Sequence, residues 1–126
     1  MSTNCGIAVK TTEGYKTIYC HWDGYPRYML AMLQDYYNSE ELADELVSHG
    51  DASCICKKLE PTTFMHSFAD PEKDVCVFYY RDRGEDWEDV APAYHTKASV
   101  LHSRFDYVYI WENDCWTVYR HGRKVG

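Results

Sequence analysis

The chain has 126 residues, a length typical of one domain, so we assign residues 1–126 to a single domain. Hydrophobic side chains make up 45% and aromatic side chains 16% of the sequence, which excludes a disordered chain. The formal net charge of −7 argues against direct binding of duplex DNA, because such binding needs a basic footprint on the protein.

Two strands joined by a turn are predicted at the start of the chain. Residues 5–9 and 15–22 have strand-like composition, and Glu13-Gly14 between them favours a hairpin. Because side chains on a strand alternate between faces, Cys20 and His21 should point to opposite sides of the sheet. They are therefore not expected to form the thiol–imidazole pair that a cysteine enzyme requires.

Residues 18–26, with the sequence Ile-Tyr-Cys-His-Trp-Asp-Gly-Tyr-Pro, concentrate aromatic and polar side chains. In the structural interpretation, Asp23 caps a helix that begins at Pro26, Trp22 fills the core and His21 bonds a nearby backbone group. In the functional interpretation, the turn forms a small pocket, and two arginines of a later turn clamp the phosphate of an anionic nucleotide. The candidate pocket residues are His21, Trp22, Asp23, Tyr25, Arg81 and Arg83.

Two adjacent short helices are predicted next. Residues 27–37 place apolar side chains at helical spacing, including Met29, Met32 and Leu33. The second helix follows a cap at Asn38 or Ser39 and ends near a glycine at position 50. The residues expected on its buried side are Leu42, Ala43, Leu46 and Val47.

The second half of the chain supplies the remaining strands. The β-branched and aromatic run 75–80 predicts a central strand, and residues 81–84 resemble a turn. Residues 106–112 and 115–120 form a second hairpin around Asn113-Asp114, and its aromatic strand 107–111 faces either the core or a homodimer mate. The predicted fold class is α+β, with a mostly antiparallel sheet of two hairpins plus a central strand and two adjacent short helices.

The six cysteines are expected to be reduced, and most of them to be buried as small apolar side chains. The start of the chain has no basic and apolar segments of a secretory signal, so a cytosolic protein is expected. Cys54-Ile55-Cys56 lies between His49 and His66, but it lacks the Cys-x-x-Cys spacing of common zinc sites. We therefore expect no metal, no cofactor and no enzymatic activity, with a structural zinc and a thiol enzyme as weaker alternatives.

Clustered acids are the main functional signal in the sequence. Between Arg27 and Lys57 there are six acids and no lysine or arginine, and residues 70–89 hold eight acids against three bases. Trp87 lies among four acids, and an exposed aromatic side chain with a charged rim is typical of an interface anchor. The alternative is a solvated surface that only promotes solubility. The candidate partner-binding residues are Glu40, Glu41, Asp44, Glu45, Glu85, Asp86, Trp87, Glu88 and Asp89.

Two motifs carry a family resemblance. The segment Tyr-Cys-His-Trp-Asp-Gly-Tyr-Pro at 19–26 and Arg-Asp-Arg-Gly-Glu at 81–85 resemble a family of small, largely uncharacterised proteins of bacteriophages, prophages and other mobile elements. The resemblance implies an accessory protein that acts in the cytoplasm of a bacterial host. Small acidic proteins of such origin are often inhibitors of host defence, including anti-CRISPR proteins. The family supplies no catalytic residues.

These observations lead to one hypothesis and one alternative. The hypothesis is a non-enzymatic inhibitor whose acidic surface blocks the basic nucleic-acid groove of a host defence protein, such as a CRISPR effector nuclease. The alternative is a small-ligand module that sequesters a nucleotide second messenger. Neither requires duplex DNA or a membrane as a partner.

Overall fold

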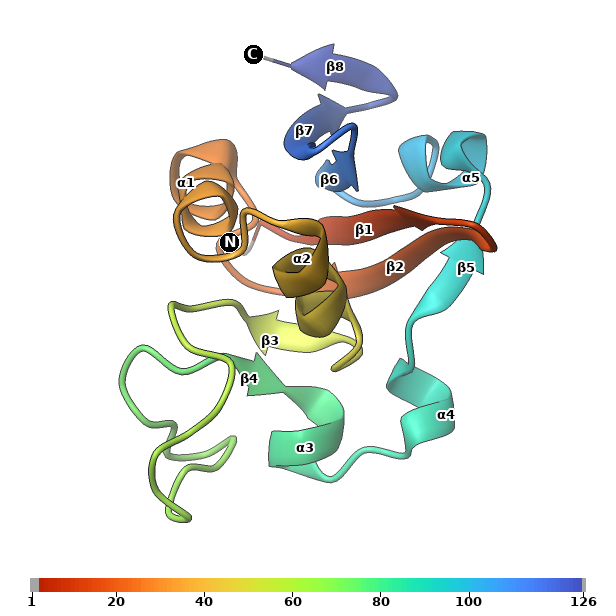
Figure 1. Cartoon of the computed structure of the whole chain (residues 1–126). Coiled ribbons are helices and arrows are strands. Elements are labelled where there is room, and N and C mark those ends of the chain that lie inside the picture. Colours follow the sequence, from red (N-terminus) through yellow and green to blue (C-terminus); the bar gives the residue numbers. More distant parts are fainter. Residues whose placement is uncertain (1–2, 126) are drawn as a thin grey trace.

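The computed structural model describes residues 3–125, which form one mixed sheet with short helices around it (Figure 1). The strands are β1 (Cys5–Thr11), β2 (Gly14–Cys20), β3 (Ala52–Cys54), β4 (Val77–Phe78), β5 (Ala93–His95), β6 (Tyr107–Glu112), β7 (Cys115–Arg120) and β8 (Arg123–Val125). The helices are α1 (Pro26–Tyr36), α2 (Glu40–Val47), α3 (Tyr79–Arg83), α4 (Trp87–Val90) and α5 (Lys97–Leu101). None of these helices has the length and apolarity needed to cross a lipid bilayer.

The strand order β4-β3-β2-β1-β6-β7-β8 confirms the predicted α+β class, although the sheet is larger than expected. Both predicted hairpins, β1–β2 and β6–β7, are antiparallel neighbours. Two pairings are parallel, β1 with β6 and β2 with β3. The short strand β5 pairs with the start of β2 outside this order. The middle of the sheet is therefore β1, which joins the two hairpins.

The two faces of the sheet are covered by different helices. Ile7 and Val9 of β1 belong to the larger core, together with the buried residues of α1 and α2. Ala8 points to the opposite face and packs with Val100 of α5 and Val108 of β6. This separation follows from the two-residue alternation of a strand buried on both sides.

The prediction of a central strand at residues 75–80 was wrong. The part of this run that joins the sheet is β4, which lies at one end of the sheet rather than at its centre, and Val75 forms an isolated bridge with Lys58. The chain turns into α3 because the Asp82 carboxylate accepts a hydrogen bond from the backbone N–H of Phe78 (2.8 Å). The predicted turn at 81–84 is in fact the end of this helix, which Gly84 closes in a left-handed conformation (φ 80°).

The aromatic strand at 107–111 is part of the core. β6 lies between β1 and β7, and the side chains of Tyr109 and Trp111 are buried within the chain itself. The aromatic residues of this strand are therefore explained by packing within the chain rather than by contact with a homodimer mate. Trp111 packs edge-on against Trp116 of β7 (ring centroids 5.5 Å apart).

The second predicted helix, α2, begins and ends as predicted. Ser39 caps α2 by accepting a hydrogen bond from the N–H of Leu42, and Gly50 follows the helix with a positive φ of 85°. Ala43, Leu46 and Val47 are buried as expected. Leu42, which was predicted on the buried side, is exposed among the acids.

Candidate functional site

The two acidic segments, residues 40–45 and 85–89, lie in neighbouring elements. The chain leaves α2 at Gly50, and the backbone N–H of Asp51 donates to the carbonyl of Val90 at the end of α4 (2.8 Å). The site of a Cβ on Gly50 would lie 2.5 Å from that carbonyl and 3.1 Å from the ring of Trp87. This close contact joins the chain just after α2 to α4.

Some of these acids are balanced by bases from elsewhere. Asp44 is paired with Lys16 of β2 (3.1 Å), and Glu85 is paired with Arg83 (3.4 Å). Among residues 3–125 the other acids of the two segments make no ion pair, and all of them are exposed. These exposed acids are Glu40, Glu41, Glu45, Asp86, Glu88 and Asp89.

Trp87 forms the wall of a cavity rather than a free anchor. The side chain is 40% exposed and packs edge-on against Tyr80 (ring centroids 5.1 Å apart). With Ser48, His49 and Arg81 these two rings line a cavity of about 460 Å³ between α2, α3 and α4. We call it the α2–α4 cavity. Its lining combines two aromatic rings with His49 and Arg81 and includes none of the exposed acids.

Arg81 is a structural residue and not a free phosphate ligand. Its guanidinium donates to the carbonyls of Leu59 (2.6 Å) and Cys76 (2.8 Å) and to both oxygens of Asp82 (2.9 and 3.0 Å). Arg83 lies over the rings of Phe68 and Tyr79. The predicted phosphate clamp is therefore not formed.

The candidate pocket at residues 21–25 is not assembled either. His21 bonds the hydroxyl of Tyr19 through Nδ1 (2.6 Å), and Trp22 is 46% exposed instead of filling the core. Asp23 does not cap α1: the N-cap residue is Tyr25, with no side-chain hydrogen bond, and Asp23 adopts a positive φ of 57°. The α2–α4 cavity, which holds Arg81, is lined by none of these turn residues.

The six cysteines fall into three groups. Cys5, Cys20 and Cys76 are buried as predicted, and Cys115 is exposed. Cys54 and Cys56 are partly exposed, with their Sγ atoms 4.0 Å apart. Within the part of the chain that the structure describes, no three His, Cys, Asp or Glu side chains gather as ligands of one metal ion.

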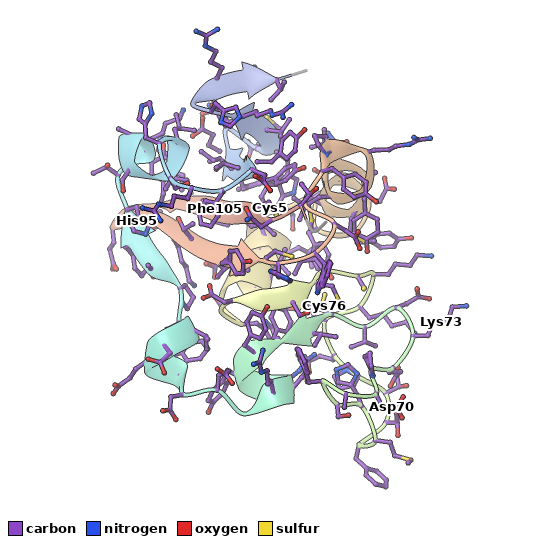
Figure 2. All side chains as sticks on the ribbon, turned by 180° about the vertical axis from the view of Figure 1, so that it is seen from behind. Cys5, Asp70, Lys73, Cys76, His95 and Phe105 are labelled. Carbon is purple, nitrogen blue, oxygen red and sulfur yellow. The ribbon has the colours of Figure 1, made fainter. Side chains whose placement is uncertain are left out.

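One further surface, the loop at residues 57–74, was not predicted from the sequence. Residues 57–74 form a long loop that carries Asp70 and Lys73 and projects from the β3–β4 end of the sheet (Figure 2). The Glu72 carboxylate holds the loop by accepting hydrogen bonds from the backbone of Thr62 and Thr63 (2.9 and 3.1 Å). This arrangement presents Phe64 with its side chain 98% exposed.

Asp51 lies between the two acidic segments, and its contribution to the free energy of unfolding depends on pH. Its carboxylate accepts the backbone N–H of Tyr19 (2.9 Å), which lies between the parts of β2 that pair with β5 and β3. Burial raises the pKa of Asp51 to about 6, although the hydrogen bond from Tyr19 opposes this shift. A raised carboxyl pKa stabilises the fold at low pH, and this stability is lost as pH rises through about 6.

We therefore expect Asp51→Asn to remove this loss, because an amide keeps the acceptor for Tyr19 without a charge. After allowance for solvent screening, the variant should gain about 1 kcal/mol over the wild type at pH 8 and nothing at about pH 4. Urea denaturation across this pH range measures the difference. Asp35→Asn, at an exposed position on α1, is the matched control. Parallel pH profiles for the wild type and Asp51→Asn would contradict the assignment.

Comparisons of the chain with protein-family models, with curated proteins and with solved structures found no match.

Proposed function

We propose that the protein is a non-enzymatic inhibitor of a bacterial host defence effector, acting as an accessory protein of a phage or mobile element in the host cytoplasm. Its target would be a protein with a basic nucleic-acid groove, most plausibly a CRISPR effector nuclease. The observation that supports the proposal is the set of six exposed acids on α2 and around α4 that have no ion-pair partners among residues 3–125.

The arrangement of the acids supports occupation of such a groove. Acids one helical turn apart on α2, such as Glu41 and Glu45, lie roughly 6 Å from each other, a spacing comparable to that of phosphates along a strand. Their summed field would steer the protein toward a positive groove and speed the encounter.

Charge reversal tests this surface. We expect the triple variant Asp86→Lys, Glu88→Lys and Asp89→Lys to reduce inhibition by about a hundredfold, since each lost charge contact in a binding surface is worth roughly 1 kcal/mol. All three residues are exposed, so the melting temperature should change little. The readout is phage plating on bacteria that carry each type of CRISPR effector, with the protein expressed from a plasmid.

The matched control reverses three exposed acids outside the two segments, at Glu13, Asp35 and Asp70. This control has the same net charge as the test variant and should keep inhibition. For purified components, inhibition by the wild type should weaken steeply as salt rises, because screened surface charges lose their attraction. Equal loss of inhibition in both triple variants would mean that net charge and not this surface is responsible. No inhibition of any effector would reject the proposal.

A further inference from the structure

We propose that Cys54 and Cys56 form a redox-active dithiol that closes into an intramolecular disulfide by exchange with a small-molecule disulfide such as oxidised glutathione. The two Sγ atoms lie 4.0 Å apart, and both side chains are partly exposed. Cys76, the nearest other thiol, is buried and contacts the backbone of Cys56 at its N–H (3.1 Å) and its carbonyl (3.4 Å). The pair is therefore the accessible dithiol of this region.

The backbone around the pair is fixed to α1. The hydroxyl of Tyr28 donates to the carbonyl of Ile55 (2.7 Å), and the hydroxyl of Tyr37 donates to the carbonyl of Cys56. Ile55 itself is fully buried between the two cysteines. Holding the intervening residue in the core keeps both thiols on the same side of the chain, which lowers the entropy lost when the ring closes.

The two thiols have different roles because their environments differ. The hydrogen bond between the Cys54 and Cys56 sulfurs lowers the pKa of Cys56 to about 7, and burial opposes this effect. The same hydrogen bond, together with burial, raises the pKa of Cys54. Cys56 therefore supplies the attacking thiolate and Cys54 the resolving thiol.

The exchange takes place in two balanced steps. The Cys56 thiolate attacks one sulfur of oxidised glutathione, the glutathione disulfide bond breaks and one glutathione thiolate leaves. Cys54 then gives its proton to solvent and attacks the Cys56 sulfur, which expels the second glutathione thiolate. Two electrons pass from the protein to glutathione, and the products are one protein disulfide and two reduced glutathione molecules.

Peptide mapping of the full chain tests the proposal. The protein is incubated with oxidised glutathione, its remaining thiols are blocked with N-ethylmaleimide, and it is digested with trypsin. Because Arg27 and Lys57 flank the pair, the tryptic peptide 28–57 carries Cys54 and Cys56 and no other cysteine. We expect this peptide to lose two hydrogen atoms and its reactivity to maleimide, and dithiothreitol to restore both.

Two variants test the order of attack. Cys54→Ser should stop at a glutathione adduct on Cys56, and Cys56→Ser should leave Cys54 unmodified. Cys115→Ser, at an exposed cysteine of β7, is the control and should leave the oxidation of peptide 28–57 unchanged. Circular dichroism checks that each variant is folded, and the wild-type peptide result needs no variant.

Three results would overturn the proposal. These are two blocked thiols remaining on peptide 28–57 while Cys115 reacts, a cross-link from 28–57 to the peptide that holds Cys76, or an adduct on Cys54 in the Cys56→Ser variant. The dithiol requires no target protein. Its failure would leave the inhibitor proposal intact, and loss of inhibition in the charge-reversed variant would leave the dithiol intact.

Discussion

Arg81→Ala is expected to reduce the free energy of unfolding by about 3 kcal/mol or more, because breaking a buried ion pair leaves an uncompensated charge. The Asp82 carboxylate has a side-chain exposure of only 4% and receives two hydrogen bonds from the Arg81 guanidinium. The carbonyls of Leu59 and Cys76 would lose their donors in the same substitution. Truncation would thus leave a nearly buried carboxylate and two carbonyls without these partners.

The effect should extend to the projecting loop. Burial would raise the pKa of Asp82, but the bonds from Arg81 and from the N–H of Phe78 outweigh it and lower the pKa overall. The same carboxylate lies 3.2 Å from Nε2 of His66, whose side chain is 1% exposed. The backbone carbonyl of Asp82 accepts a hydrogen bond from the N–H of Phe68. Arg81 therefore holds the carboxylate that connects α3, β4 and the loop.

Urea denaturation measures the global effect, and amide hydrogen exchange shows whether the loop amides lose protection first. Arg83→Ala is the matched control, since Arg83 is two residues away and half exposed, and its partner Glu85 is exposed. Such a surface pair contributes at most about 1 kcal/mol. If the two alanine variants were equally stable, the network around Asp82 would not be a structural element.

Local patterns in the sequence were sufficient for the hairpins and for α2. In β1 and β6 the alternation of side chains matches the two faces of the sheet, and Asn113 and Asp114 both adopt the left-handed conformation of a tight two-residue turn. In α2 the cap at Ser39 and the glycine after the helix act within a few residues of the helix itself. Interactions between residues close together in the chain can be predicted from a single sequence.

Interactions across long sequence separations explain the errors. The run 75–80 has strand composition, but it stops pairing at Phe78, whose own N–H donates to the Asp82 carboxylate at the start of α3. That carboxylate is available for capping because Arg81 and His66 hold it in place. The position of Arg81 depends in turn on Leu59, which lies 22 residues away. These groups are spread over residues 59–82, farther apart than the patterns that identify a single strand or helix.

The candidate surface was predictable in the same limited sense. The acids of the two segments were visible in the sequence, but their balance by Lys16, 28 residues from Asp44, was not. The α2–α4 cavity joins His49 to Trp87 only because the chain between them returns to the end of α2 through the Asp51–Val90 hydrogen bond. The residue types of a surface were therefore predictable, and its shape was not.

The motif at 18–26 is expected to be mainly a structural junction, which predicts a large effect for Gly24→Ala. The site of a Cβ on Gly24 lies 2.7 Å from the backbone of Asn4 and 2.9 Å from the Cβ of Cys5. The N–H of Gly24 donates to Thr3 (2.8 Å), and its carbonyl accepts the buried hydroxyl of Tyr109 (2.7 Å). The turn thus fastens the start of β1 to β6, and a methyl group would push it away.

We expect Gly24→Ala to cost about 2–3 kcal/mol, the usual range for forced overpacking against a fixed backbone, which thermal and urea unfolding will both detect. Gly84→Ala is the informative control. Gly84 has a left-handed φ of 80° but nothing within 4 Å of its Cβ position, so its substitution should cost only the conformational penalty of about 1 kcal/mol. Trp22→Ala, at an exposed position of the same motif, should cost less than Gly24→Ala. If the Gly24→Ala and Gly84→Ala proteins were equally stable, the backbone around Gly24 would accommodate a methyl group. A structural role would then not explain the aromatic and polar residues of the motif, and a binding role would be needed.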